Sequence, residues 1–437
     1  MARVSQGTAA ATAEDADRDA AGGPPGERNW ARNVVYTGAF VHPRSVEEAQ
    51  QVVADASRVH AVGTRHAFND SADGPGVLLC LDRLPMALEI DEAARTATVG
   101  GGARMGDVAL ALDAAGWALH NLASLPHISL AGAVATGTHG SGDRLGTLSS
   151  AVRALEMIGP DGGLRTVRQG DPDFPGSVVA LGALGVVTRL TVAIEPTYEV
   201  RQDVYLGLPW DAALEHLDAV TGSAYSVSLF TTWVGDAIER VFLKSRDTEP
   251  PDDLFGARPS DEAVDAVDQG VEVKMTQQGG VPGPWWDRLP HFRLEATPSV
   301  GEELQTEYLV PRVAAVQALE AVRGLADRLA PALHVTEIRT MAADDLWLSG
   351  AYGTDAVGIH FTWRDLPDLV LPLLEPLEER LLPLGARPHW GKIHGASGPR
   401  LRDHYPRWTD FVALRDRVDP ERKFGNAHLE RVFGSDA

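Results

Sequence analysis

Three glycine-bearing turns in the first third of the sequence could hold an anionic cofactor. They read VGTRH at residues 62–66, VGGG at 99–102 and TGTHGSG at 136–142, and each follows a stretch typical of a strand. Glycine lets the backbone approach a ligand closely, and successive backbone N–H groups in such turns bind anions. The turns therefore suggest a cofactor that contains a diphosphate, although their spacing alone also fits ordinary surface turns.

Two pairs of polar residues alternate along probable strands in the second half of the chain. Glu337 and Arg339 lie in the sequence VTEIR, and His360 and Thr362 have the same spacing. Alternate residues of a strand point to one face, so the members of each pair share a face. Spacing alone favours a structural interpretation, with a solvated sheet face for the first pair and a satisfied buried pair for the second.

Motifs for several other kinds of chemistry are missing from the sequence. The fourteen histidines form no HExxH motif and no His pair with a carboxylate at ligand spacing, so no metal site is predicted. There is no P-loop, and no GxGxxG follows a first strand. Ser124 and Ser141 lie outside any GxSxG elbow, which disfavours a serine hydrolase. Cys80, the single cysteine, lies in an apolar run and is predicted to be a buried small hydrophobe.

The composition is that of a soluble globular protein. A length of 437 residues suggests two or three domains, and 44% apolar residues are enough for a sizeable core. The formal net charge of −22 argues against nucleic-acid and anionic-membrane partners, because both need a basic surface. No apolar run approaches the roughly 18 residues of a membrane helix, and no secretory signal is visible, so a cytoplasmic location is expected.

Local patterns predict the elements that must hold these residues in place. Ser45 and Glu48 form a capping box at the start of a helix that continues with apolar residues at helical spacing. A second helix is expected at about 104–115, closed by Gly116. Strands are expected at 59–62, 77–82, 87–91 and 95–99.

Shifts in composition divide the chain into segments. Residues 1–27 are rich in Ala, Asp, Gly and Pro and are predicted to be a disordered tail. A first domain is expected at 28–195, and a second α+β domain of strands and amphipathic helices at 196–395. Within the second domain, Pro, Gly and Asp clusters indicate a long loop region at 240–290.

Motifs spread in order over nearly the whole chain are more specific than any single turn. GTRHAFN at 63–69 resembles the histidyl-FAD attachment loop of the vanillyl-alcohol-oxidase superfamily, and ASLPHIS at 123–129 with ATGTHGSG at 135–142 resembles its second flavin-contacting segment. LGALGVVT at 181–188 resembles the strand that ends the FAD-binding domain. HWGK at 389–392 and the residues Asp419, Pro420, Lys423, Phe424 and Asn426 resemble motifs of the sugar-oxidising branch. Its alditol-oxidising group is similar at YSVSLF 225–230, GPW 283–285, LQTEYL 304–309, EIRT 337–340 and HFTW 360–363.

This resemblance implies a fold and a cofactor. The fold class would be α+β, with a two-part FAD-binding domain of the PCMH type, a substrate domain with an antiparallel sheet flanked by helices, and a segment at 396–437 that returns to the FAD-binding domain. FAD would be attached covalently through His66 alone, because Cys80 lies far from the second flavin segment. The implied cofactor-binding residues are His66, Gly63, Thr64, Arg65, Ala67, Phe68, Ala123, Ser124, His127, Ser129, Gly132, Thr136, Gly137, Thr138, His139, Gly140, Ser141, Gly185, Val187 and Asn426.

The resemblance also implies a substrate and a reaction. The expected activity is oxidation of the terminal hydroxyl of an alditol, such as xylitol or sorbitol, to the aldose, with reduction of O₂ to H₂O₂. The expected partners of this monomeric enzyme are the polyol and O₂. Hydroxyl groups need both donors and acceptors, and the implied substrate pocket supplies both. It consists of Ser124, Gln305, Glu337, Arg339, His360, Thr362 and Lys392.

Three of these residues would take part in the reaction. Lys392 would accept or orient the hydroxyl proton, with a pKa lowered by burial and by Arg339, although a surface lysine after a turn is the alternative. Arg339 would stabilise negative charge, and His360 is a competing base. Ala123 would lie beside the flavin ring and leave room for oxygen.

The sequence departs from the family pattern at two places, and other functions also fit some of its motifs. Arg65 stands where the family often has Gly and adds a charge near the flavin, and residues 245–280 match poorly and could shape the substrate entrance. An aldonolactone oxidase or dehydrogenase of the same superfamily is the alternative function, because it shares the HWGK motif. A flavin-binding protein without turnover and a carbohydrate-binding module without flavin are more distant alternatives.

Overall fold

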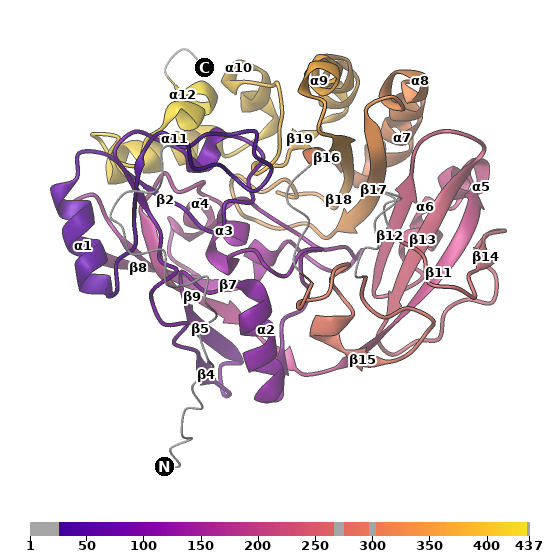
Figure 1. Cartoon of the computed structure of the whole chain (residues 1–437), viewed down its shortest axis with the longest axis horizontal. Helices are drawn as coiled ribbons and strands as arrows, with labels where there is room; N and C mark the ends of the chain where they lie inside the picture. The colour runs from indigo at the N-terminus through magenta and orange to yellow at the C-terminus, as the bar shows by residue number, and fades with distance from the viewer. Residues whose placement is uncertain (1–25, 266–274, 297–302, 435–437) are drawn as a thin grey trace.

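The computed structural model describes residues 26–265, 275–296 and 303–434. Residues 1–25, most of the expected disordered tail, lie outside the described residues. Two parts lie side by side in Figure 1: the N-terminal strands and helices with the C-terminal helices above them, and a large sheet that carries its own helices. None of the helices in these ranges combines the length and the apolar character that crossing a membrane requires.

Two sheets build the N-terminal part. The parallel sheet has the strand order β1-β3-β2, with β1 (Ala39–Val41), β2 (Val59–Ala61), β3 (Val77–Leu79) and α1 (Val46–Asp55). The antiparallel sheet has the order β4-β5-β9-β7-β8, with β4 (Glu89–Asp91), β5 (Thr96–Gly100), β7 (Val152–Ile158), β8 (Leu164–Arg168) and β9 (Val186–Ala193). The remaining elements are α2 (Met105–Ala114), α3 (Leu130–Ala135), α4 (Phe174–Val178) and the strand pair β6 (Trp117–Ala118) and β10 (Glu195–Pro196).

Local sequence patterns account for the start and end of the first helices. Ser45 Oγ accepts a hydrogen bond from the backbone N–H of Glu48 at 3.1 Å, as the capping box predicts. The Glu48 carboxylate accepts from the backbone N–H of Arg44 at 2.7 Å, one residue earlier than the motif requires, so the box is only half formed. The helix predicted at 104–115 is α2, and Gly116 follows it with a φ of 82°.

The glycine triplet at 100–102 serves the packing of the protein itself. A Cβ on Gly101 would lie 2.0 Å from the carbonyl oxygen of Val187, and a Cβ on Gly102 would lie 1.9 Å from that of Leu81. Nonbonded atoms cannot approach so closely, so only glycine fits where β5 leads into α2. These backbone contacts explain the glycines of this turn without a bound anion.

A nine-stranded antiparallel sheet forms the other part. Its strand order is β14-β11-β13-β12-β17-β18-β16-β19, and β15 also pairs with β11. The strands are β11 (Glu199–Pro209), β12 (Ser226–Thr231), β13 (Ala237–Ser245), β14 (Arg258–Pro259), β15 (Gly283–Pro284), β16 (Glu303–Pro311), β17 (Leu333–Met341), β18 (Ala356–Arg364) and β19 (Arg387–Pro388). The loop region expected at 240–290 begins at residue 246, after β13, and includes β14 and β15.

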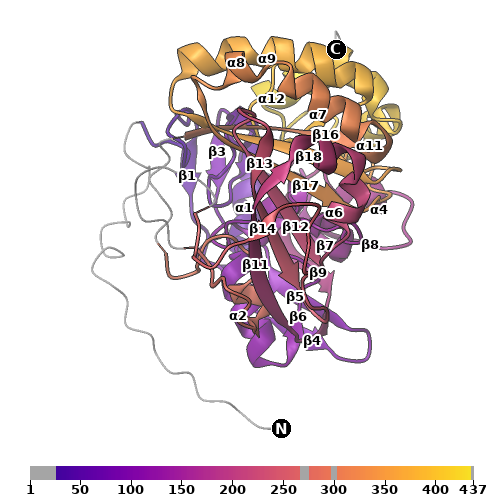
Figure 2. The same cartoon turned by 90° about the vertical axis from the view of Figure 1, so that its right-hand side faces the viewer.

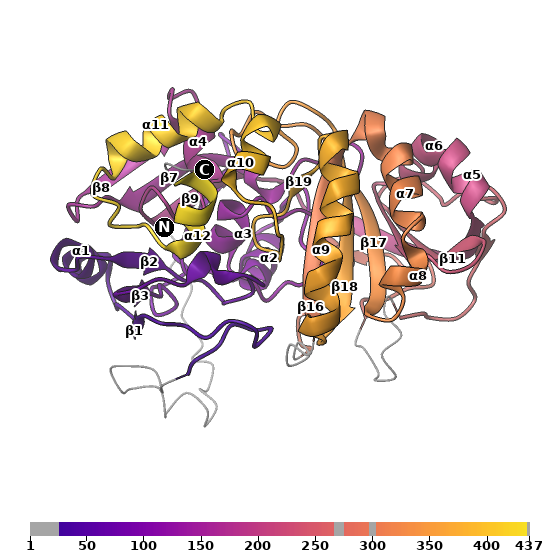
Figure 3. The same cartoon turned by 90° about the horizontal axis from the view of Figure 1, so that it is seen from above.

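Helices cover one face of this sheet, as Figures 2 and 3 show. They are α5 (Trp210–Glu215), α6 (Leu217–Thr221), α7 (Ala315–Arg323), α8 (Ala326–Leu329) and α9 (Pro367–Leu381). Ile338 and Ile359 belong to the apolar cluster packed beneath these helices. Because side chains alternate along a strand, Glu307, Glu337 and His360 point to the opposite face. The register places these three side by side, since His360 pairs with Glu307 on β16 and with Glu337 on β17.

The C-terminal helices lie against the N-terminal part and are yellow in Figure 1. They are α10 (Gly398–Leu401), α11 (Trp408–Val418) and α12 (Ala427–Phe433). Asn426 caps α12 by accepting a hydrogen bond from the backbone N–H of Leu429 at 2.8 Å. Its amide nitrogen donates to the carbonyl of Ser71 at 2.9 Å. The side chain of Asn426, an expected cofactor-binding residue, thus makes these hydrogen bonds with the protein and joins the two ends of the chain.

Candidate active site

The expected flavin-attachment loop lies beside the expected second flavin segment. Thr64 Oγ1 accepts a hydrogen bond from the backbone N–H of Ser129 at 3.0 Å. A Cβ on Gly63 would lie 2.2 Å from Ser129 Oγ, and a Cβ on Gly132 would lie 2.6 Å from the same atom. Glycine at these two positions therefore lets both segments close around Ser129, which precedes α3.

His66 is the residue of this loop whose side chain is free for chemistry. Its imidazole stacks on Trp30, with ring centroids 5.5 Å apart and an interplanar angle of 23°. Both ring nitrogens are buried without a well-formed hydrogen bond in the described part of the chain. Burial lowers the pKa of His66 to about 4, so the imidazole is neutral near pH 7. A neutral imidazole with an unpartnered nitrogen is chemically suited to hold a flavin.

The same loop contacts the HWGK motif from the other end of the chain. The backbone N–H of Phe68 donates to the Gly391 carbonyl at 2.8 Å. The Asn69 amide donates to the carbonyls of Trp390 at 2.9 Å and Lys392 at 2.8 Å. The Lys392 ammonium lies 4.6 Å from the centroid of the Phe68 ring, a cation–π contact. Two motifs far apart in the sequence therefore meet directly.

Arg339 on β17 is the centre of a buried ion network. Its Nη2 donates to Glu307 Oε1 at 2.8 Å, and its Nε lies 3.7 Å from Glu337 Oε2. Its Nη1 donates to Ser124 Oγ at 3.5 Å and to the carbonyl of His139 at 3.4 Å. Burial acts to lower the pKa of Arg339, but Glu337 and Glu307 outweigh it and raise the pKa. The large sheet and the second flavin segment thus meet at one permanently charged guanidinium.

Gln305 on β16 connects Lys392 with His360. Its Oε1 accepts hydrogen bonds from Lys392 Nζ and from His360 Nε2, the latter at 3.1 Å. Thr362 pairs with Gln305 across the strands and is also buried. Burial, opposed by Glu307 and helped by Arg339, lowers the pKa of Lys392 to about 8. Lys392 therefore lies in the site and is not the surface lysine that the sequence left as an alternative.

Glu307 is missing from the predicted set, although the network depends on it. Burial acts to raise the pKa of Glu307, but Arg339 and His139 outweigh burial and hold the pKa well below its usual range. His139 Nε2 lies 3.1 Å from Glu307 Oε1. Gln305 and Glu307 alternate on β16 as Glu337 and Arg339 do on β17, and this pattern is the signal that could have revealed Glu307.

His139, Glu307 and His389 also lie close enough together to hold a metal ion, which no sequence motif indicates. One ligand atom from each lies within 4.8 Å of the others, and all three residues are buried. However, Arg339 donates to the same Glu307 oxygen that faces His139. A fixed guanidinium at this oxygen repels a second cation, so the cluster fits an ion network better than a metal site.

Other residues of the expected second flavin segment also contact protein groups. His127 Nε2 donates to the carbonyl of Leu294 at 2.8 Å, and Ser141 Oγ donates to the carbonyl of Val227 on β12. Ala123 is buried next to Ser124 in the chain. The remaining members directly follow α3, at Thr136, Gly137, Thr138 and Gly140. The segment therefore joins the two parts of the molecule.

The structure places Gly185 and Val187 where β9 begins. Gly185 has a φ of 141°, and a Cβ there would lie 2.5 Å from the carbonyl oxygen of Ile158. The carbonyl of Val187 is the group that Gly101 approaches. Both positions are therefore shaped by contacts between backbone segments of the protein.

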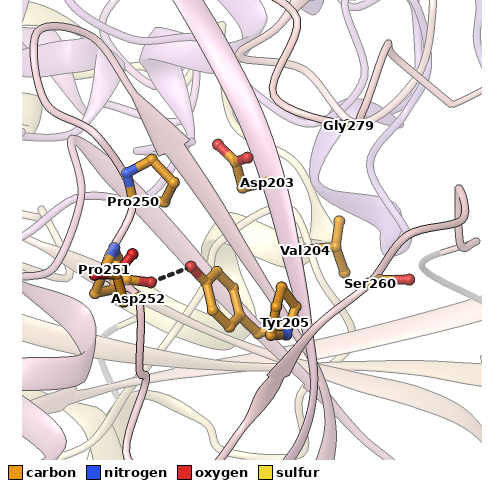
Figure 4. A pocket seen from close by; sticks show the side chains of 9 residues that line it. Asp203, Val204, Tyr205, Pro250, Pro251, Asp252, Ser260 and Gly279 are labelled. Atoms are coloured by element: carbon orange, nitrogen blue, oxygen red, sulfur yellow. Dashed lines mark hydrogen bonds between the residues drawn. The ribbon is translucent and has the colours of Figure 1, made fainter.

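A separate pocket of about 240 Å³ lies on the outer strands of the large sheet (Figure 4). The Tyr205 hydroxyl points toward Pro251 and donates a hydrogen bond to its carbonyl at 2.5 Å. Strands β13 and β12 separate β11 from β17, so this pocket is distinct from the ion network. Its lining residues are Asp203, Val204, Tyr205, Pro250, Pro251, Asp252, Pro259, Ser260 and Gly279.

Comparisons with known proteins agree with this arrangement. Residues 37–168 match the FAD-binding domain family, and residues 301–432 match the D-arabinono-1,4-lactone oxidase family. An alditol oxidase from Streptomyces sp. (strain IKD472 / FERM P-14339) is 47% identical over 93% of this chain and 98% of its own. An L-gulono-1,4-lactone dehydrogenase from Mycobacterium tuberculosis is 30% identical over the same shares. The chain belongs to the vanillyl-alcohol-oxidase superfamily of FAD-binding flavoproteins.

The fold of this flavoprotein agrees with that membership. A mutant cholesterol oxidase from Brevibacterium sterolicum superimposes with a TM-score of 0.77 at 13% identity, covering 98% of this chain and 100% of that one. The predicted α+β fold class with a PCMH-type FAD-binding domain is thereby confirmed.

Arg65 is where this flavoprotein departs from the family pattern. Its φ is 61°, a left-handed conformation that glycine adopts without strain, and this explains why glycine is frequent there. The guanidinium pairs with Glu27 and lies 5.7 Å from the centroid of the Phe40 ring. Arg65 contributes less than burial or Lys392 to the lowered pKa of His66. A carboxylate thus compensates the extra charge beside His66.

We expect Arg65→Gly to be more stable than Arg65→Ala by about 1 kcal/mol in the free energy of unfolding. Both variants lose the contacts with Glu27 and Phe40, but only glycine takes the positive φ without strain at Cβ. Urea denaturation followed by tryptophan fluorescence measures the difference. Equal stability of the two variants would contradict a left-handed conformation at this position.

Proposed function

We propose that this flavoprotein oxidises the terminal hydroxyl of an alditol to the aldose and reduces O₂ to H₂O₂. The observation that carries the proposal is the buried polar face of the large sheet, which meets the attachment loop of His66 through Lys392. The relationship to an alditol oxidase at 47% identity supports the same substrate class. Xylitol and sorbitol are the substrates we expect to test first.

The residues of the site suit a chain of hydroxyl groups. Glu337 offers a carboxylate acceptor, Arg339 offers guanidinium donors, and the hydroxyls of Ser124 and Thr362 can do both. Glu337 and Arg339 are only 5% and 7% exposed, so a bound polyol would replace water around them. Bound FAD would supply the chemistry of hydride acceptance and electron transfer to O₂. His66 would hold it covalently, with Thr64, Ser129 and Gly132 shaping the adjoining loop.

Lys392 is the group best suited to accept the hydroxyl proton. Its pKa of about 8 leaves a useful fraction of neutral amine near neutral pH. Burial lowers the pKa of His360 to about 3, and its Nε2 donates to Gln305, so His360 is a much weaker base. Arg339 supplies a fixed positive charge that would stabilise an alkoxide forming nearby.

Oxidation of an aldonolactone is the second candidate function. The match of residues 301–432 to the D-arabinono-1,4-lactone oxidase family favours it, as does the 30% identical L-gulono-1,4-lactone dehydrogenase. Both functions would use the same flavin, and both would bind the substrate with the C-terminal part of the chain. They differ in the substrate and can be separated by experiment.

We expect xylitol and sorbitol to reduce the flavin of the anaerobic enzyme and to give one H₂O₂ per O₂ consumed in air. Both L-gulono-1,4-lactone and D-arabinono-1,4-lactone should reduce it at least about a hundredfold more slowly at equal concentration, because they lack the extended polyol that the face binds. Flavin absorbance and a peroxidase-coupled assay measure the two effects. Faster reduction by a lactone would favour the second candidate function.

Covalent attachment predicts that flavin stays with the protein after acid denaturation. A gel of the denatured enzyme should show flavin fluorescence on the protein band, because a bond to His66 survives unfolding. His66→Ala should lose the fluorescent band. His127→Ala is the control, since that ring donates to the Leu294 carbonyl, and its band should stay fluorescent. A dark band from the unsubstituted protein would rule out the covalent link.

The role of Lys392 predicts a rate that rises with pH. The neutral amine is present above its pKa of about 8 and is lost below it, so the limiting rate of flavin reduction should increase between about pH 6 and about pH 10. Lys392→Met should be slower by about a hundredfold or more and should lack this rise. Anaerobic stopped-flow measurements at several pH values test both effects. A rate that is flat with pH in the unsubstituted enzyme argues against Lys392 as the base.

A further inference from the structure

A line of buried polar groups continues from Glu337 on the side away from Glu307. His291 Nε2 lies 2.8 Å from Glu337 Oε1, and Lys244 Nζ lies 3.3 Å from His291 Nδ1. Lys244 is 1% exposed and His291 is 4% exposed. Lys244 comes from β13, and His291 comes from the segment that follows β15. The reaction described above uses neither of them directly.

The hydrogen-bonding capacity of these groups fixes the direction of each bond. The Lys244 ammonium has three protons and faces three acceptors, which are the carbonyls of Leu289 and Pro290 and the Nδ1 of His291. Burial lowers the pKa of Lys244 to about 7, and its protonated form cannot accept, so Nδ1 accepts from it. Burial acts to raise the pKa of Glu337, but Arg339 and His291 outweigh it, so the ionised carboxylate can only accept from Nε2. Burial and Lys244 lower the pKa of His291, so its ring is neutral and carries one proton. That proton is therefore on Nε2 and is donated to Glu337.

Packing holds the imidazole of His291 in this orientation. Its centroid lies 5.3 Å from that of Phe230 and 5.9 Å from that of Phe242, both in edge-to-face geometry. The backbone N–H of His291 donates to the Ser124 carbonyl at 3.1 Å. The residue thus contacts the large sheet and the second flavin segment at once, and its ring has little freedom to turn.

We propose that Lys244 and His291 form a positioning pair that holds Glu337 as an oriented acceptor for a substrate hydroxyl. His291 Nε2 contacts Oε1, and Arg339 Nε lies 3.7 Å from Oε2, beyond hydrogen-bond distance, so Oε2 keeps capacity to accept a bond from a hydroxyl. The pair acts through Glu337 and does not itself touch the substrate. This assignment rests on the proposed function, because the hydroxyl is that of an alditol.

The first experiment compares variants of His291 in the FAD-loaded enzyme with xylitol, by anaerobic stopped flow. His291→Phe keeps an aromatic ring but removes the donor, and we expect the dissociation constant for xylitol to rise at least about tenfold. The limiting rate of flavin reduction should change less, because the proton acceptor is untouched. His291→Gln should restore part of the affinity, since its amide N–H can reach Glu337.

Thr276→Val is the matched control for loosening of the same segment. Thr276 Oγ1 donates to the Pro290 carbonyl at 2.8 Å, a bond that does not involve Glu337. We expect its xylitol affinity to stay within about twofold of the unsubstituted enzyme. An unchanged affinity in His291→Phe, or an equal loss in Thr276→Val, would overturn the positioning role.

The second experiment reads the proton on His291 without any substrate. In protein labelled with ¹⁵N-histidine, the signal that disappears in His291→Phe should have the shifts of a neutral ring protonated on Nε2. Lys244→Met should raise the pH at which this ring takes up a second proton, because the positive charge of Lys244 no longer lowers the pKa of His291. A ring protonated on Nδ1, or no response to Lys244→Met, would overturn the pair. If no alditol reduces the enzyme, the proposed function fails while this measurement still decides the pair.

Discussion

A guanidinium buried between two carboxylates is the constraint on which the rest of the site depends. Arg339 is 7% exposed and lies between Glu307 of β16 and Glu337 of β17, on the same face of the sheet. Removing one partner of such a buried pair typically costs about 3–5 kcal/mol, because the other charge is left uncompensated. The sheet also keeps space for the network at Gly358, where a Cβ would lie 3.2 Å from Glu307 Oε1. The network therefore depends on opposite charges around Arg339, on the register of the strands, and on the absence of a side chain at Gly358.

The site is assembled from both parts of the chain, and hydrogen bonds hold the parts in register. Arg339 reaches Ser124 and the carbonyl of His139, both from the N-terminal part. In the other direction, Asn69 holds the backbone of Lys392 beside the attachment loop. A shift of one part relative to the other would break these bonds together. Proximity of the loop that carries His66 to the polar face is thus a property of the whole fold.

The sequence predicted the elements well where one short pattern decides the structure. Ser45 marks the start of α1, and alternation along β17 and β18 places Glu337, Arg339 and His360 on one face. It could not reveal His291, because the contact with Glu337 joins a loop to a strand and has no fixed spacing. The triplet around Gly101 shows a second limit, since its glycines also serve close backbone contacts that spacing alone does not reveal.

The charges of the whole site are consistent with the proposed role of Lys392 as the proton acceptor. Arg339, Lys244 and Lys392 are the three cations around two anions, Glu307 and Glu337. With Lys392 neutral and Lys244 protonated the site carries no net charge, and proton transfer from an alcohol to Lys392 would pair a new ammonium with the alkoxide. Arg339 keeps its proton because its pKa is raised. Burial also lowers the pKa of Lys244, to about 7, and its Nζ contacts the carbonyls of Leu289 and Pro290 and the Nδ1 of His291. Transfer of the substrate proton to neutral Lys392 would therefore place each new charge beside an opposite one, as its proposed role requires.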